Sequence, residues 1–360
     1  MPGTEAPDGA LPGALVRAGV PDRAGAPVRV ALLLPGQGAQ YRRMAVGLYD
    51  AEPVFAAAMD EVFEAFGPAG PGLRAAWTDD GAPTETAAWA QPLLFAVDYA
   101  LGRLVAGWGV APSALLGHSV GEMAAAALAG VFSVGDAARL VLDRVERVAA
   151  APAGGMLAVA AGVAEVGPYL EPEVVVGAVN APRHTVLAGP REALGRVAER
   201  LEAAGLVTLP VPSDTAFHSP VLAPALAGSR AVFARVAPLP AAVPLYSGVT
   251  AAVLAPHEAV DPGFWADQPV RPVLFRAALD ALLSDGPYLL VEAGPGGGLA
   301  GIARRHPAVR RAGGAVVPLL PSRPGGDAAD RTALARAAEV LRSRGLPVPP
   351  SGAAVRAGGS

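Results

Sequence analysis

The chain of 360 residues contains no cysteine. A disulfide framework, a thiolate nucleophile and a cysteine-ligated metal site are therefore excluded. Lysine is absent as well, so arginine carries every basic charge, and 28 basic against 32 acidic residues leave a net charge of −4. A nucleic-acid-binding protein normally has a basic excess, so this class of function is not expected.

Long uninterrupted apolar runs are also missing. No stretch reaches about 18 apolar residues without a charge, a proline or a cluster of glycines, so no membrane span is expected. The first residues hold acids and prolines where a signal peptide needs an apolar segment. Yet 52% of the residues are hydrophobic, too many for a disordered chain even with 44 glycines and 37 prolines. The sequence predicts a soluble, globular, cytoplasmic protein with ample core.

Hydrophobic periodicity divides the chain into a large α/β unit interrupted by a small one. An apolar run from Val28 to Leu34 is typical of a central parallel strand, and helical patterns follow around 42–66 and 90–108. A βαββαβ-like rhythm after residue 153 predicts an inserted α+β unit. We expect a disordered leader over 1–28, the large unit over 29–153 and 213–322, the small unit over 154–212, and a C-terminal helix with a loose tail over 323–360.

A candidate nucleophile lies in the G-x-S-x-G pentapeptide Gly117-His118-Ser119-Val120-Gly121, between a predicted strand and a predicted helix. A serine in such a sharp turn exposes its hydroxyl, and the helix N-terminus adds positive potential where an oxyanion would form. The alternative is a glycine- and serine-rich turn without chemistry. The pattern predicts Ser119 as the nucleophile.

A serine nucleophile needs a base, and the chain has five histidines. His118 should point away from Ser119 in the turn. His218 lies where the chain returns from the small unit to the large one, which predicts a place in the cleft between them. By elimination His218 is the best candidate base, with a structural histidine as the alternative. The other three occur in loop or surface sequence: His184, His257 and His306.

Four segments, in order, carry a family resemblance. They are PGQGAQ at 35–40, GHSVGE at 117–122, AFHSP at 216–220 and EAGP at 292–295. With these motifs the sequence resembles the malonyl-CoA:acyl-carrier-protein transacylases and the acyltransferase domains of modular polyketide synthases, from about Val30 to Arg305. The resemblance implies an α/β-hydrolase-like large subdomain with an inserted ferredoxin-like small subdomain.

The resemblance also implies a role for each matching residue. Ser119 would attack a thioester and hold the acyl group as an ester, while His218 moves the protons. The backbone N–H groups of Gln37 and Val120 would form the oxyanion hole. Gln268 stands where many relatives have an asparagine whose backbone carbonyl orients the histidine. Three further residues are expected to line the substrate pocket: Gln91, His118 and Phe217.

Arg144 bears on the substrate class, because it is in register with the family arginine that binds the free carboxylate of malonyl. A planar guanidinium binds a carboxylate through two parallel hydrogen bonds. A solvated helix arginine is the alternative, since Arg139 and Arg147 lie nearby. Val120 and Phe217 match the malonyl type of their motifs and favour malonyl over methylmalonyl. Three positions depart from the usual family pattern: Tyr41, Gln268 and the pair Asp214-Thr215.

The resemblance therefore predicts a ping-pong acyltransferase. It would move a malonyl-type unit from coenzyme A to the phosphopantetheine thiol of a holo acyl carrier protein, in polyketide or fatty acid biosynthesis. Carrier-to-carrier transfer of an aminoacyl, peptidyl or starter unit, and an editing thioesterase, are the alternatives. The initial methionine and the missing ketosynthase sequence favour a discrete, trans-acting enzyme.

No bound cofactor, metal, nucleic acid or membrane partner is expected. Docking of an acidic carrier requires a local basic patch on this net-negative chain. Ordinary solvated arginines are the alternative interpretation. The candidates are Arg42, Arg43, Arg304 and Arg305, the last two together with Arg310 and Arg311.

Overall fold

The structure is a computed structural model that describes residues 28–311 and 313–350. The leader predicted over 1–28, apart from Val28, and the last ten residues of the predicted tail lie outside the described residues. No helix in the described part of the chain has both the length and the apolar character that a membrane crossing requires.

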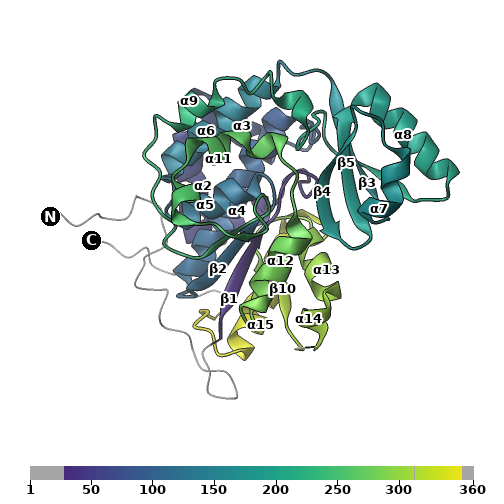
Figure 1. The fold of residues 1–360 in the computed structure, drawn as a ribbon. Helices are drawn as coiled ribbons and strands as arrows, with labels where there is room; N and C mark the ends of the chain where they lie inside the picture. Colours follow the sequence, from purple (N-terminus) through teal and green to yellow (C-terminus); the bar gives the residue numbers. More distant parts are fainter. Residues whose placement is uncertain (1–27, 312, 351–360) are drawn as a thin grey trace.

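A mixed sheet forms the centre of the large subdomain (Figure 1). In the described residues it has six strands, in the order β10-β9-β1-β2-β7-β8. All neighbours are parallel except β8, which pairs antiparallel with β7. The strands are β1 (Val30–Leu34), β2 (Pro112–Gly117), β7 (Leu245–Ser247), β8 (Ala252–Val253), β9 (Leu289–Glu292) and β10 (Val316–Pro318).

Strand β1 lies between two parallel neighbours and is buried over its whole length, as its apolar sequence predicts. Successive side chains point to opposite faces of a sheet. Leu32 and Leu34 accordingly join one core, whereas Ala31 and Leu33 join another. Helices α2 (Pro53–Ala65), α4 (Ala87–Gly107), α5 (Gly121–Leu128) and α6 (Val134–Val148) enclose the first core; α12 (Phe275–Ser284) and α13 (Gly298–Arg305) enclose the second.

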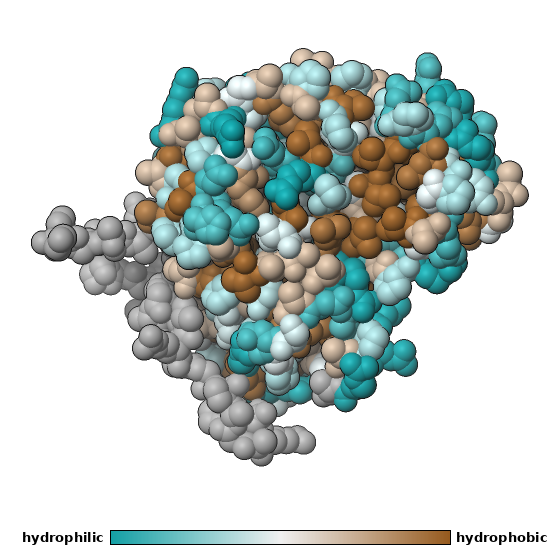
Figure 2. All heavy atoms as spheres, viewed as in Figure 1, coloured by the Kyte–Doolittle hydropathy of each residue, from teal (hydrophilic) through white to brown (hydrophobic). Residues whose placement is uncertain are grey.

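The small subdomain is an antiparallel sheet in the order β4-β5-β3-β6. Helix α8 (Arg191–Ala203) covers one face, and the other face packs through Met156, Ala178 and Ala188 on the core of the large subdomain. Figure 2 shows apolar atoms gathered on the face where Figure 1 places β3, β4 and β5. Beside β3 in the sheet, Leu209 of β6 is 68% exposed, and Val207, just before β6, is 70% exposed. The strands are β3 (Gly154–Val159), β4 (Val175–Ala181), β5 (His184–Pro190) and β6 (Thr208–Val211).

Shorter helices and a long C-terminal helix complete the described fold. The C-terminal helix, α15, packs on α1 and on β10. The bounds are α1 (Val46–Tyr49), α3 (Gly70–Thr78), α7 (Val163–Val166), α9 (Ser229–Phe233), α10 (Pro256–Ala259), α11 (Pro262–Asp267), α14 (Pro307–Arg311) and α15 (Gly326–Ser343).

The parallel strands bring three of the four sequence motifs to one edge of the large sheet. β1, β2 and β9 end at Leu34, Gly117 and Glu292, so the segments that follow them share the carboxyl edge. In α/β sheets this edge is where ligands bind. The fourth motif, around His218, follows the small sheet directly in the chain.

Candidate active site

Ser119 lies in the tight turn between β2 and α5, with a φ of 55°. A non-glycine residue rarely adopts this left-handed conformation, and its presence here is typical of a nucleophile turn. Backbone atoms lie so close to two glycines at this turn that neither could carry a side chain. A Cβ on Gly121 would lie 2.2 Å from the carbonyl oxygen of Leu34, and one on Gly36 would lie 2.4 Å from that of His118. The first motif is therefore held directly against the serine turn.

His218 is hydrogen-bonded to Ser119, with 2.7 Å between Nε2 and Oγ. Its other ring nitrogen, Nδ1, lies 2.8 Å from the carbonyl oxygen of Arg271. A carbonyl can only accept, so Nδ1 carries the proton and Nε2 is left to accept the proton of the serine hydroxyl. The backbone N–H of His218, at a φ of 63°, donates to the carbonyl of Pro269 at 2.7 Å. The structure thus brings together the two residues that the sequence selected as nucleophile and base.

The serine and the histidine are both buried, at 6% and 2% exposure. Burial, with a smaller contribution from the charges of His118 and Arg144, lowers the pKa of His218 to about 3, although the bond to the Arg271 carbonyl opposes this shift. The imidazole is therefore neutral at physiological pH. A neutral imidazole is the form that can act as a general base.

Gln268, at the start of the 3-10 turn Gln268–Val270, differs from its expected role. Its backbone carbonyl was expected to orient the histidine, but Nδ1 of His218 donates to the carbonyl of Arg271, three residues further on. The Gln268 carbonyl only adds a weaker contribution to raising the pKa of His218. Its side-chain amide instead donates to the carbonyl of Ser119 at 2.8 Å. Gln268 therefore stabilises the serine turn through its side chain. The carbonyl that binds the histidine ring belongs to Arg271, the residue directly after the 3-10 turn.

Gln37 and Val120 were expected to supply the oxyanion hole. Among the described residues, neither backbone N–H has a hydrogen-bond partner, so both are available to a ligand. The side chain of Gln37 is fixed from both sides. Its amide donates to the carbonyls of Glu85 and Pro212, both at 3.3 Å, and its oxygen accepts from Gln91 at 3.3 Å. Gln91, predicted to line the pocket, is thus a direct neighbour of the candidate oxyanion residue.

Arg144 is the most unusual charge of the site. Only 4% of the residue is exposed, yet within the described chain it forms no hydrogen bond or ion pair, and its Nη2 is fully buried without a partner. Burial lowers its pKa to about 10, so the guanidinium stays charged at neutral pH. Its charge acts on His218 and on the buried carboxylate of Glu122. A buried guanidinium whose N–H groups lack hydrogen-bond partners is costly unless a ligand occupies them.

His118 forms no hydrogen bond with Ser119 or His218 in the described part of the chain, although its charge lowers the pKa of His218. Its Nε2 lies 2.9 Å from the side-chain oxygen of Asn180 on β4, and its ring lies 5.5 Å from that of Phe275. Asn180, which no sequence motif singled out, therefore ties the small sheet to the nucleophile turn. Phe217 is buried at 2% exposure beside the histidine.

The unusual residues before the histidine motif have a structural explanation. The hydroxyl of Thr215 donates to the Asp214 carboxylate at 2.9 Å, and the same carboxylate oxygen accepts from the N–H of Ala87 at 3.2 Å. Ala87 is the first residue of α4, so Asp214 satisfies one of the free N–H groups of that helix. The pair anchors the His218 segment to the helix that carries Gln91.

The arginines considered for carrier docking are not equivalent. Arg42 donates to the carbonyl of Ala82, and Arg43 pairs with Asp327 and Asp80. Arg304 donates to the carbonyl of Val316. The side chain of Arg305 has no bonded partner among the described residues, and its charge lowers the pKa of His184 on the small sheet. Arg305 is therefore the one that keeps its donors available while lying near the small subdomain; Arg310 and Arg311 are exposed at the end of α14.

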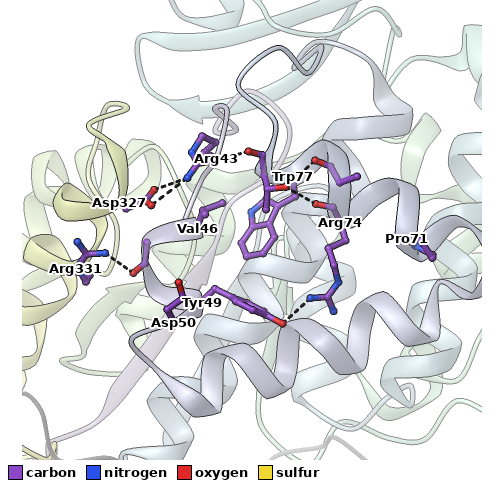
Figure 3. Close-up of a pocket in the computed structure, with 12 residues that line it drawn as sticks. Arg43, Val46, Tyr49, Asp50, Pro71, Arg74, Trp77, Asp327 and Arg331 are labelled. Carbon is purple, nitrogen blue, oxygen red and sulfur yellow. Dashed lines mark hydrogen bonds and ion pairs between the residues drawn. The ribbon is translucent and has the colours of Figure 1, made fainter.

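A cavity of about 570 Å³ lies elsewhere, between α1, α3 and α15 (Figure 3). None of the catalytic or substrate-binding candidates lines it. Its arginines are already engaged: Arg43 with Asp327, Arg74 with Tyr49, and Arg331 with the carbonyl of Gly47. In the described part of the chain, no group of three or more His, Asp or Glu residues is placed to hold a metal ion.

Comparison with known proteins identifies the family. Residues 32–340 match the family model of the acyl transferase domain. The chain belongs to this acyltransferase family. Over 281 residues this acyltransferase is 41% identical to a component of the phenolphthiocerol/phthiocerol polyketide synthase of Mycobacterium tuberculosis, covering 78% of the chain and 19% of that protein. The chain thus spans about a fifth of that relative.

Solved structures agree with the family. The acyltransferase domain from the second module of the salinomycin polyketide synthase is 37% identical, with a TM-score of 0.79 over 89% of this chain and 75% of that one. The malonyl-CoA:acyl carrier protein transacylase of Xanthomonas oryzae is 28% identical, with a TM-score of 0.73 over 85% and 97%. These matches confirm the resemblance and the predicted fold class of this acyltransferase, an α/β-hydrolase-like subdomain with a ferredoxin-like insertion.

Proposed function

We propose that this acyltransferase moves a malonyl-type unit from coenzyme A to the phosphopantetheine thiol of an acyl carrier protein, through an ester on Ser119. The observation that carries the proposal is Arg144, a buried guanidinium without a partner whose charge reaches the catalytic histidine. A free carboxylate on the acyl group would pair with it through charge-assisted hydrogen bonds. An acetyl group would leave the cation unpaired, which disfavours its transfer.

The first half-reaction loads the enzyme. The hydroxyl oxygen of Ser119 attacks the thioester carbonyl while Nε2 of His218 takes the hydroxyl proton. The N–H groups of Gln37 and Val120 stabilise the oxyanion; losing one such donor typically costs about 10²–10³ in rate. The C–S bond then breaks, and His218 returns the proton to the departing thiolate of coenzyme A.

The second half-reaction unloads the ester. His218 takes the proton of the carrier thiol, the thiolate attacks the ester carbonyl, and Ser119 leaves with the proton that the histidine returns. This chemistry uses no bound cofactor or metal ion. We propose a docking role for Arg305, since Arg42, Arg43 and Arg304 are engaged within the chain.

Intact-protein mass spectrometry tests the proposal. The full chain is mixed briefly with malonyl-, methylmalonyl- or acetyl-CoA, and then with a holo carrier protein. We expect a single malonyl adduct that passes to the carrier and that is absent in Ser119→Ala. Ser113→Ala, which changes a serine on the neighbouring strand, is the matched control and should load normally.

Other outcomes have distinct meanings. A malonyl adduct on Ser119→Ala would refute the assigned nucleophile. A folded protein that takes no adduct from any coenzyme A ester would indicate carrier-to-carrier transfer of another acyl unit. An adduct that decays to free acid in the presence of the carrier would indicate an editing thioesterase.

A further inference from the structure

Glu122 is a buried carboxylate that the proposed acyl transfer does not use. It is the second residue of α5, three positions after the nucleophile, and only 1% of it is exposed. The hydroxyl of Ser247 donates to Oε2 at 2.9 Å, and the backbone N–H of Gly248 donates to Oε1 at 2.8 Å. Both oxygens are thus held by neutral donors at the end of β7, Ser247 being its last residue and Gly248 the residue after it.

Helix α5, which carries Glu122, packs on α6, which carries Arg144, and the charge of Arg144 lowers the pKa of the Glu122 carboxyl. The two charges attract, so Glu122 raises the pKa of the Arg144 guanidinium, and Asp143 adds a smaller effect in the same direction. Within the described chain, however, no hydrogen bond or ion pair joins them, because the carboxylate oxygens are held elsewhere. Glu122 therefore balances the charge of Arg144 without occupying its N–H groups, and these remain available to a substrate.

A substrate carboxylate bound to Arg144 would therefore be a second negative charge, beside that of ionised Glu122, acting on the same guanidinium. Like charges that share a buried site disfavour each other's ionised forms. We propose that Glu122 is a specificity-determining residue: in its protonated form the pocket strongly prefers an acyl group with a free carboxylate, and in its ionised form this preference weakens. The inference rests on the proposed function, since it assumes that Arg144 receives such a carboxylate.

The surroundings of Glu122 place its titration in an accessible range. Burial raises its pKa to about 7, against the bonds from Ser247 and Gly248 and the charge of Arg144, which lower it. Facing it are Arg144 from α6, with a pKa of about 10, and the neutral amide of Gln268. His218, coupled to Arg144, titrates with a pKa of about 3.

Helix α4 also packs on α5 and carries a buried carboxyl, Asp98. Its charge interaction is with Glu292 and not with Glu122. Among these groups only Glu122 changes charge near neutral pH while facing Arg144.

The direction of the pH effect follows from linkage. A bound carboxylate raises the pKa of Glu122, so binding takes up a proton. The preference for malonyl should be greatest below about pH 7 and should decline as the pH rises through the pKa of the free enzyme. If the bound carboxylate raises that pKa by about one unit, the decline is about tenfold.

The test is the ratio of kcat/KM for malonyl-CoA to kcat/KM for acetyl-CoA, measured on the full chain from about pH 6 to about pH 8.5. The titration of His218 affects both donors and cancels in the ratio. We expect the wild-type ratio to fall about tenfold. Glu122→Gln, which keeps the shape and an acceptor for Gly248, should hold the ratio constant at its low-pH value.

Two further variants make the test specific. Ser247→Ala removes a donor to the carboxylate, so it should raise the pKa of Glu122 and move the decline to higher pH; it decides the question if Glu122→Gln does not fold. Glu292→Gln is the matched control, because burial also raises the pKa of Glu292 to about 7 but its charge partner is Arg304. The control should decline as the wild type does.

The outcomes separate this inference from the proposed function. A wild-type ratio that does not change with pH, or a Glu122→Gln enzyme that declines like the wild type, would overturn the role of Glu122 while malonyl loading on Ser119 stands. A failure of malonyl-CoA to load at any pH would overturn the proposed function and this inference with it.

Discussion

Replacing Arg144 with alanine should convert a malonyl-selective pocket into a weak and unselective one. Removing one partner of a buried charge pair typically costs about 3–5 kcal/mol. Because about 1.4 kcal/mol corresponds to a factor of ten, kcat/KM for malonyl-CoA should fall about 10²–10⁴-fold. Acetyl-CoA makes no such pair, and the variant no longer buries an unpaired cation, so its kcat/KM should stay constant within about threefold.

The assay is the initial rate of acyl-enzyme formation with each donor, followed by mass spectrometry on the intact chain. Arg144 also lowers the pKa of His218, but this effect acts on both donors, so their ratio isolates recognition of the carboxylate. Arg139→Ala is the matched control: it lies on the same helix, its side chain is 65% exposed, and it pairs with Asp136. An equal loss with both donors in Arg144→Ala would show that the arginine has a structural role, and would refute the reasoning.

Two further changes test the packing around the site. Phe217→Ser should open space for an α-methyl group and raise the methylmalonyl-to-malonyl ratio of kcat/KM, by up to about 10–200-fold, since one methyl group is worth about 1–3 kcal/mol; an unchanged ratio would place this selectivity elsewhere. Ser133→Ala removes the N-cap of α6, where the serine oxygen accepts from the N–H of Asp136 at 3.0 Å. It should lower the free energy of unfolding by about 0.5–2 kcal/mol in a urea titration, and an unaltered midpoint would contradict the capping role.

Local sequence was sufficient to predict the pairing of Ser119 with His218 and the central strand. Ser119 was predicted from a pentapeptide in which Gly121 is required by a close backbone contact. Strand β1 was predicted from an apolar run, and all of its residues are buried. His218 followed from its place at the return from the inserted unit. Each of these signals lies within a few consecutive residues, or in the order of segments along the chain.

Contacts between distant segments could not be predicted in this way. Asn180 reaches His118 across 62 positions, and the carbonyl of Arg271 reaches His218 across 53. A carbonyl leaves no trace in residue identity, and an isolated asparagine in a strand has no distinguishing pattern. Glu122 belonged to a recognised motif, but its relation to Arg144 appears only once α5 and α6 are packed.

Helix prediction failed where tertiary contacts override local preference. The helical pattern around 42–66 is interrupted, since α1 ends at Tyr49 and α2 begins at Pro53. Helix α3 begins with Gly-Pro-Gly, which disfavours a helix, and it was not predicted. Its Trp77 is nevertheless buried, and the indole N–H donates to the carbonyl of Met44 at 2.8 Å. Burial of this ring compensates for the weak intrinsic preference of the segment.

The small sheet is fastened to the site at both of its edges. Beside β4, Asn180 binds His118, and the N–H of Val179 donates to the carbonyl of Val273 at 2.8 Å. Beyond β6, the carbonyl of Pro212 accepts from Gln37. Both edges of the small sheet are therefore bonded to segments beside the serine turn, one to His118, which adjoins Ser119, and one to Gln37. A shift of the small sheet relative to the large one would strain both contacts at the same time.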